Sequence, residues 1–247
     1  MTTILTVENL TKTYPAFHLG PVSFTVEAGS IMGFIGRNGA GKTTTLKSIL
    51  NLTHPDTGSI RYFGQALSGN ERSVKQRIGF AGGAVNYYPR KKISELVAVT
   101  RRFYDNWDDT AYRKYMDIFS IDPQKTPREL SEGMKVKLNL ALALSHRAEL
   151  LILDEPTSGL DPVSREELLE IFTALRERGV AILFSTHITS DLDKCADAIT
   201  YIRKGELVAS EAMESFLTGH RMRGEGNNLE EIMLRCEKED YREKFAE

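Results

Sequence analysis

The stretch Gly36-Arg-Asn-Gly-Ala-Gly41-Lys42-Thr43 decides the fold of this chain. It matches the pattern G-x-x-x-x-G-K-[ST], in which glycines let the backbone curl so that successive N–H groups point inward around a phosphate. The β-rich run IMGFI ends just before it, and apolar residues at helical spacing follow as far as Leu52. The order strand, loop, helix therefore predicts a phosphate site at a helix N-terminus, whose dipole also attracts anions.

The side chains of this loop predict a nucleoside triphosphate with a magnesium ion. Lys42 is expected to reach the β- and γ-phosphates, and the Thr43 hydroxyl is expected to complete the coordination of Mg²⁺. Thr44 adds a contact nearby. The nucleotide contacts predicted in the loop are Gly36, Asn38, Gly39, Ala40, Gly41, Lys42, Thr43 and Thr44.

Two carboxylates follow a second apolar run, in Leu150-Leu-Ile-Leu-Asp154-Glu155-Pro156. This places them at the carboxyl end of a buried strand, where open α/β sheets bind ligands. An unpaired buried carboxylate is costly, and a bound metal ion would remove that cost for Asp154. Glu155 would then point at the water that attacks the γ-phosphate, as a general base or a positioning group.

Composition and charge exclude several classes of protein. The chain has 247 residues, of which 41% are hydrophobic, and 19 glycines, so it is neither disordered, collagen-like nor a coiled coil. Thirty-two Lys+Arg against 34 Asp+Glu give a formal charge of −2. No global positive field therefore recruits nucleic acid or an anionic membrane.

Cysteine usage and hydropathy predict a cytoplasmic chain. The two cysteines, Cys195 and Cys236, lie far apart without metal-type spacing, and they are expected to be small buried side chains in a reducing compartment. The longest run without a charged residue, 13–26, contains two prolines and cannot span a bilayer. The N-terminus lacks the basic and apolar regions of a signal peptide.

Patterning divides the chain into an α/β core and an inserted helical lobe. The predicted core covers 1–85 and 147–218, the lobe 86–146 and a tail 219–247. In the core, 150–153 and 180–184 are short apolar runs typical of parallel strands, joined by a crossover helix at 166–177. In the lobe, 93–104 and 111–119 are expected helices. Residues 134–144 alternate with period two, but Ala and Leu dominate their second half, so we predict a helix there.

The tail carries one apolar stripe. Leu229, Ile232, Met233 and Cys236 fall at i, i+3, i+4 and i+7, as on one face of a helix. Such a helix can dock a partner or fold back on its own domain, and the sequence leaves both interpretations open.

Further motifs in a fixed order carry a resemblance to a known family. Leu130-Ser131-Glu132-Gly133-Met134-Lys135 follows the glycine loop, Ser158-Gly-Leu-Asp161 follows the carboxylates, and His187 ends Phe184-Ser-Thr-His. Together these motifs resemble the ATP-binding cassette (ABC) ATPases over about Ile4 to Leu217. Ser131 and Gly133 match the family signature L-S-G-G-Q, Asp161 the D-loop and His187 the switch histidine. Tyr14 stands where the family stacks an aromatic ring on adenine.

The resemblance implies an α/β fold of the P-loop type, with a mixed sheet core and a helical lobe. It implies ATP and Mg²⁺ as cofactors, Thr43 and Asp154 as metal-site residues, and Glu155 with His187 as catalytic residues. In the family, Ser131 and Gly133 contact the nucleotide of a second subunit. Taken alone, Ser131 is an ordinary helix cap, His187 a structural residue and Tyr14 a core aromatic.

The implied partners are a second ATPase subunit, identical or paralogous, and a separately encoded transmembrane permease, with no nucleic acid. The signature and the ending LEEIMLR at 229–235 look like cassettes of bacterial export systems, including antibiotic and multidrug efflux. The permease would hold the chain at the inner face of the membrane. Tyr87 and Tyr88, near a groove at 81–92, would receive a permease helix or pack on their own lobe.

The sequence departs from the family at the signature and at the glutamine after the strand 78–80. Gly83 stands at the aligned position, so either Asn86 or water completes the magnesium shell. Glu132 and Met134 replace Gly and Gln in the signature, which predicts slow or partner-dependent hydrolysis. One rival function is a soluble ABC-type ATPase acting on nucleic acid or ribosomes. A GTPase or small-molecule kinase is disfavoured, because no Asn-Lys-x-Asp motif occurs.

Overall fold

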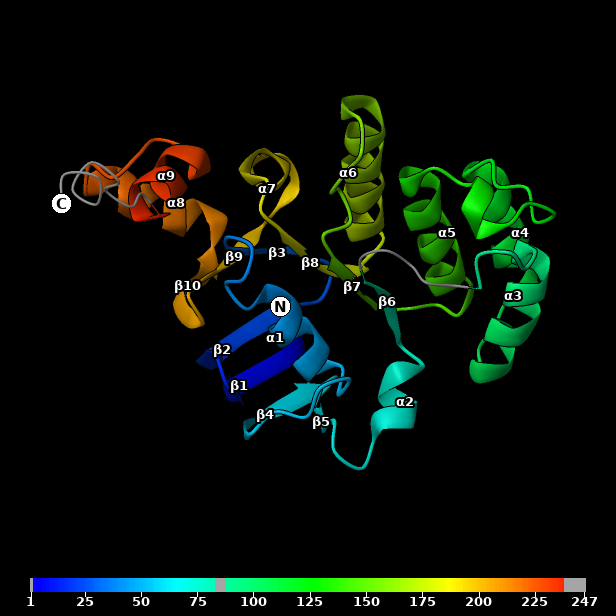
Figure 1. Cartoon of the computed structure of the whole chain (residues 1–247), viewed down its shortest axis with the longest axis horizontal. Helices are drawn as coiled ribbons and strands as arrows, with labels where there is room; N and C mark the ends of the chain where they lie inside the picture. Colours follow the sequence, from blue (N-terminus) through cyan, green and yellow to red (C-terminus); the bar gives the residue numbers. More distant parts are fainter. Residues whose placement is uncertain (1, 83–87, 238–247) are drawn as a thin grey trace.

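A computed structural model describes residues 2–82 and 88–237, and its central layer is a six-stranded sheet (Figure 1). The strand order is β10-β9-β3-β8-β7-β6, with parallel pairing throughout except that β10 runs antiparallel to β9. The predicted mixed sheet is thereby confirmed. Its strands are β3 (Ile31–Ile35), β6 (Ile78–Gly82), β7 (Leu150–Asp154), β8 (Ala181–Thr186), β9 (Ala198–Arg203) and β10 (Glu206–Ala212).

A four-stranded antiparallel sheet lies on one side of this layer, with helix α1 (Lys42–Ile49) between them. Apolar side chains of both sheets and α1 form one core, in which the rings of Phe24 and Phe34 lie 5.6 Å apart. Burying this apolar area is the main force that holds the two sheets together. The strands are β1 (Thr3–Tyr14), β2 (Phe17–Glu27), β4 (Thr57–Tyr62) and β5 (Gln65–Ala66).

Helices cover the opposite face of the six-stranded sheet (Figure 1). They are α6 (Pro162–Glu177), α7 (Thr189–Cys195), α8 (Met213–Met222) and α9 (Leu229–Glu237). A second core fills this side, where Phe172 of α6 packs 5.5 Å from Phe184 of β8. The predicted crossover helix is correct in type but begins earlier, because Asp161 caps its N-terminus by accepting the N–H groups of Val163 and Ser164.

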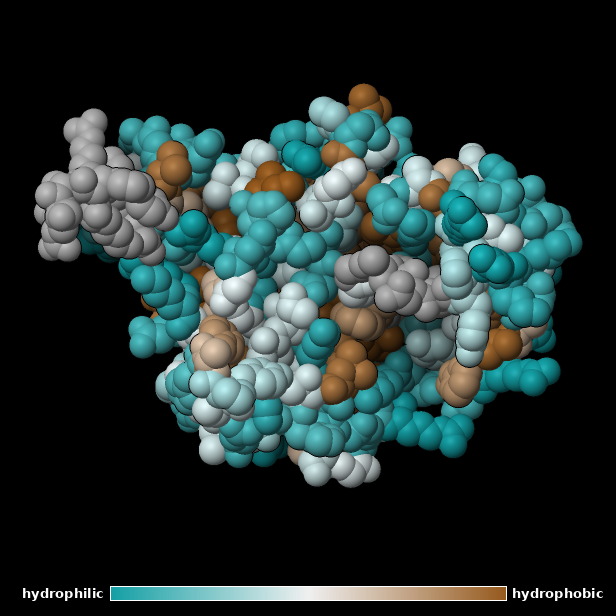
Figure 2. Space-filling view, in the orientation of Figure 1, coloured by the Kyte–Doolittle hydropathy of each residue, from teal (hydrophilic) through white to brown (hydrophobic). Residues whose placement is uncertain are grey.

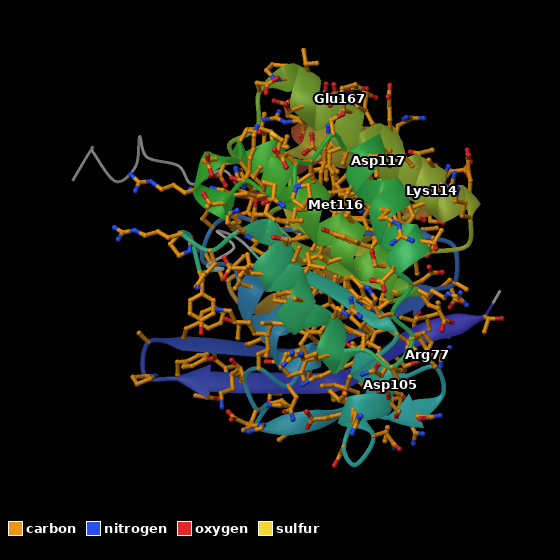
Figure 3. The ribbon with its side chains drawn as sticks, turned by 90° about the vertical axis from the view of Figure 1, so that its right-hand side faces the viewer. Arg77, Asp105, Lys114, Met116, Asp117 and Glu167 are labelled. Carbon is orange, nitrogen blue, oxygen red and sulfur yellow. The ribbon has the colours of Figure 1, made fainter. Side chains whose placement is uncertain are left out.

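The helical lobe projects to one side of the sheet (Figure 1). In Figure 3, which looks onto this lobe, Met116 of α4 belongs to the buried core, while Lys114 and Asp117 on the same helix are exposed. The predicted helix at 93–104 becomes 3₁₀ after Thr100. The elements of this lobe are α3 (Ile93–Thr100), η1 (Arg101–Phe103), α4 (Asp109–Ile118), η2 (Pro127–Glu129) and α5 (Glu132–Ser145), whereas the short helix α2 (Glu71–Lys75) lies beside β6.

Helix α5 explains the misleading period-two pattern of its sequence. All its residues from Leu138 to Ser145 are buried, because the helix lies between the lobe and the sheet. A helix surrounded by apolar neighbours has no polar face, so the usual helical periodicity is lost. The contact with β6 is close: a Cβ added to Gly79 would lie 2.4 Å from the Cβ of Ala143.

The tail helix α9 packs on its own domain. Leu229 and Ile232 are fully buried and lie against α7, which supports the interpretation that the tail folds back. The hydroxyl of Tyr201 donates to Glu237 at 2.8 Å. Cys195 is buried, and burial raises the pKa of its thiol to about 12, so it is an inert core side chain. Within 2–82 and 88–237, none of the helices is both long and apolar enough to cross a bilayer.

Candidate nucleotide-binding site

The glycine loop connects β3 to α1 and turns sharply at Gly41. Gly41 has φ +115°, a left-handed conformation that side chains rarely adopt, and it stands at the N-cap of α1. At Gly36, a Cβ would lie 2.3 Å from the carbonyl oxygen of Ile202. These two positions show why the loop needs glycine: the backbone must turn into the helix while passing close to β9.

Lys42 is a buried cation whose ammonium group is fully engaged by the loop and by β7. Its Nζ donates to the carbonyl of Gly36 at 2.7 Å and to that of Arg37 at 3.3 Å. The carboxylate of Glu155 lies 3.1 Å away. Because a buried charge needs such partners, the loop and Glu155 together hold the ammonium group at the N-terminal end of α1.

The two carboxylates at the end of β7 have different partners. Asp154 accepts from the Thr43 hydroxyl at 2.8 Å through Oδ2 and from the Ser185 hydroxyl at 2.5 Å through Oδ1. Glu155 Oε2 lies 2.7 Å from Nδ1 of His187. Asp154 is therefore connected to α1 and β8, whereas Glu155 is connected to the loop lysine and to the histidine after β8.

A cavity of about 600 Å³ opens over these groups. This volume is in the range of small-molecule sites. Eight of the predicted loop and catalytic residues line it together with residues that the sequence reasoning did not assign to the site. Its walls are Phe17, Arg37, Asn38, Gly39, Gly41, Lys42, Thr43, Thr44, Glu155, Ser158 and His187.

The aromatic side chain on the cavity wall is Phe17 and not the predicted Tyr14. The two residues face each other across the β1–β2 hairpin, and Tyr14 is 41% exposed, with the ammonium group of Lys12 5.7 Å from its ring centre. A hairpin register decides which ring reaches the cavity, and the order of residues along the chain does not reveal it.

Six predicted nucleotide contacts do not line the cavity: Tyr14, the loop residues Gly36 and Ala40, and the signature and D-loop residues Ser131, Gly133 and Asp161. Ser131 is the exposed N-cap of α5 and accepts the N–H of Met134 at 3.2 Å. Gly133 is buried against the start of α6, where a Cβ would lie 3.5 Å from Ser164. Hydrogen bonds from the Ser164 hydroxyl and amide hold the pKa of Asp161 below its usual value. The signature motif and the D-loop thus form one surface.

A second cavity, of about 350 Å³, adjoins the first at Glu155 and Ser158. Glu132 and Lys135 of the signature helix line it, and they pair with each other at 2.6 Å. This pairing offsets the extra negative charge that Glu132 brings to the signature. Figure 2 shows hydrophobic surface gathered between the four-stranded sheet and the helical lobe. The positions Gly83, Asn86 and Tyr87 lie outside the described residues, and Tyr88 is 75% exposed.

Sequence reasoning did not single out Ser185, whose hydroxyl contacts Asp154. It is fully buried on β8, directly opposite Asp154 in the sheet register. The available signal was the end of the run Ala181–Thr186, where two hydroxyl residues follow four apolar ones. Polar side chains at the carboxyl end of a buried parallel strand point to the ligand edge of the sheet.

Fold and site together define a P-loop nucleoside triphosphatase, because a parallel sheet, a GKT loop at a helix N-terminus and paired carboxylates meet at one edge. The ABC transporter family pattern matches residues 19–158, and the chain belongs to this family. Within it, the chain is an ATP-binding subunit with ATPase function.

Several known proteins are similar to it. The bacitracin transport ATP-binding protein BcrA of Bacillus licheniformis is 34% identical over 84% of this chain and 69% of its own length. The Nod factor export ATP-binding protein I of Burkholderia lata is 36% identical over 79% of this chain and 66% of its own length. A solved ATP-binding subunit of an ABC transporter superposes with a TM-score of 0.84 at 28% identity, covering 96% of this chain and all of that one.

Proposed function

We propose that this ATPase drives export through a separately encoded transmembrane permease, as half of an ATP-dependent pair of cassettes. The observation that carries the export proposal is that similar proteins are named for bacitracin transport and for Nod factor export. The alignments span about two thirds of those relatives' own lengths, so substrate and partners are inferred for this chain. Neither relative's name supports action on nucleic acid or ribosomes.

The residues present fit a magnesium ion held with ATP. Mg²⁺ prefers oxygen ligands and retains several waters, so it needs few side chains beyond the substrate phosphates. The Thr43 hydroxyl, on the cavity wall, and the Asp154 carboxylate offer such oxygens 2.8 Å apart. When bound with ATP, the ion would neutralise the negative charge that develops in phosphoryl transfer.

The remaining polar groups supply binding and proton handling. Lys42 would exchange its present contact with Glu155 for the phosphates, which leaves the Glu155 carboxylate available to orient the attacking water and accept its proton. His187, 2.7 Å from that carboxylate, would hold it in place and reach toward the γ-phosphate. The loop N–H groups and the dipole of α1 would stabilise the triphosphate.

A second cassette would complete the site. Ser131, Gly133 and Asp161 lie outside the nucleotide cavity of their own chain, at the exposed starts of α5 and α6. An N-terminal helix end presented to a neighbour suits the γ-phosphate bound by that neighbour. Two chains placed head to tail would thus bury two ATP molecules in an isologous interface, with an identical or a paralogous partner.

Recovery of the permease tests the export proposal. We expect a polytopic membrane protein to copurify with the tagged chain from detergent-solubilised cells of its source, identified by mass spectrometry and retained by the Glu155→Gln variant. A matched chain carrying Tyr88→Glu should recover less of it, because Tyr88 is an exposed ring beside the predicted groove. Recovery of ribosomal or nucleic-acid partners, and of no membrane protein, would contradict the proposal.

A further inference from the structure

The buried hydroxyl of Ser185 contacts both carboxylate residues at the end of β7. It donates to Asp154 Oδ1 at 2.5 Å and accepts the backbone N–H of Glu155 at 2.9 Å. The Ser185 carbonyl accepts the same N–H at 3.1 Å. One residue therefore fixes a side chain and the backbone next to it.

These contacts act on a strained part of the backbone. Glu155 has φ +52°, in the left-handed region that residues with a side chain rarely adopt. Such conformations persist only where the surroundings over-determine them. Two acceptors on one N–H provide that constraint here, and the direction of the Glu155 side chain depends on it.

The neighbouring residues of β8 have separate tasks. The Thr186 hydroxyl accepts the N–H of Ile188 at 2.9 Å, which shapes the turn after His187. Asp154 is held from its other side by Thr43, a residue we assign to the metal site. Ser185 is thus the partner that orients Asp154 without itself being assigned to nucleotide or metal.

We propose that Ser185 is a positioning residue for hydrolysis, which sets the orientation of Asp154 toward Mg²⁺ and of Glu155 toward water. The inference rests on the metal assignment proposed above. Partners that orient metal ligands typically contribute about 10- to 100-fold to metal affinity or activity. We expect an effect of this size from the hydroxyl alone, because the strand and its backbone contacts remain in place.

The experiment compares Ser185→Ala with Ser145→Ala, which also removes a fully buried serine hydroxyl, one that donates to the carbonyl of Ala141 in α5. Binding of a fluorescent ATP analogue is titrated with Mg²⁺ and repeated in EDTA. Ser185→Ala should raise the Mg²⁺ concentration at half-effect about 10- to 100-fold. In EDTA, Ser185→Ala should bind the ATP analogue with the affinity of the parent chain. Ser145→Ala should match the parent chain with and without Mg²⁺. These two results would also show that both variants fold.

Further variants distinguish a wrong role for Ser185 from a wrong assignment of the metal site. Ser185→Thr retains the hydroxyl and should recover most of the Mg²⁺ response, whereas Ser185→Cys replaces it with a larger and weakly donating thiol and should not. If Asp154→Asn loses the Mg²⁺ dependence of ATP binding but Ser185→Ala keeps it unchanged, the proposed role of Ser185 is wrong. If Asp154→Asn also behaved like the parent chain, the metal assignment itself would be wrong.

Discussion

The glycine-loop cavity and the signature surface differ in how complete they are within one chain. At the cavity, Lys42, Glu155 and His187 are linked directly, by an ion pair of 3.1 Å and a hydrogen bond of 2.7 Å. At the signature surface, Ser131 caps its own helix and is exposed. Binding groups are thus preassembled in one region and merely presented in the other.

This difference suggests a division of labour between binding and turnover. A single chain holds the groups that bind ATP, so binding is expected before any partner arrives. In the proposed dimer, the exposed starts of α5 and α6 would gain a ligand only when the second chain brings its nucleotide to them. Hydrolysis controlled in this way would depend on assembly, and the following variants test each side of the comparison.

Glu155→Gln should have the largest effect. Without a carboxylate to accept the proton, turnover should fall about 1,000-fold while ATP binding persists. Light scattering with ATP and Mg²⁺ should then show a stable dimer, at twice the 27.7 kDa of one chain. Glu149→Gln, an exposed residue paired with Arg77 at the start of β7, is the matched control and should hydrolyse normally. Turnover at the parent rate in Glu155→Gln would remove Glu155 from the mechanism.

The substitution Ser131→Arg disrupts the signature surface. A long cation at the exposed N-cap of α5 should weaken ATP-dependent dimerisation at least about 100-fold, since it obstructs the surface that meets the second nucleotide and opposes the helix dipole. ATP binding to the single chain should be unchanged in a fluorescence titration. Ser68→Arg, in the exposed turn after β5, is the control. A dimer that survived Ser131→Arg would place the interface elsewhere.

Comparison of Phe17→Ala with Tyr14→Ala tests which aromatic ring stacks on the adenine base of ATP. Stacking of a base on an aromatic side chain contributes about 1–3 kcal/mol, so Phe17→Ala should weaken ATP affinity about tenfold. Tyr14→Ala should weaken it less, because Tyr14 does not line the cavity. Isothermal titration calorimetry compares the two, and a larger loss in Tyr14→Ala would restore the family's assignment.

A buried histidine lies outside both regions, at the C-terminal end of α5, and should make the packing there acid-sensitive. His146 at the end of α5 stacks on Tyr104 at 3.7 Å, its Nδ1 donates to the carbonyl of Gln76, and burial lowers its pKa to about 4. Since the unfolded chain binds this proton near pH 6.5, stability is present above that pH and is lost on acidification toward pH 4. We expect about 1 kcal/mol to be lost between pH 7 and 5.5.

Denaturant titrations of the parent chain and of His146→Phe measure this effect. The phenylalanine ring can keep the stack on Tyr104 but cannot titrate, so the variant should lack this part of the pH dependence. An equal loss of stability on acidification in both chains would assign the effect to other groups.

Sequence reasoning succeeded where a motif lies within one strand–loop–helix unit. The loop at 36–43 and the carboxylates Asp154 and Glu155 needed only local geometry, and α5 was predicted from composition against its periodicity. It did not reveal contacts between separate segments: Phe17 lines the cavity through a hairpin register, and Ser185 meets Asp154 through parallel pairing of β7 with β8. Such pairings are set by the packing of the whole sheet, and residue spacing does not encode them.

If each active site is built from two chains, two inactive variants with complementary defects should restore activity when they are mixed. Lys42→Ala disables the glycine-loop cavity and Ser131→Arg disables the signature surface. Each variant alone should therefore lack ATPase activity. In a mixed dimer, the intact cavity of one chain would face the intact signature of the other. We predict that phosphate release reappears on mixing. Activity that stays at the level of the separate variants, or a Ser131→Arg chain that is active alone, would contradict the account.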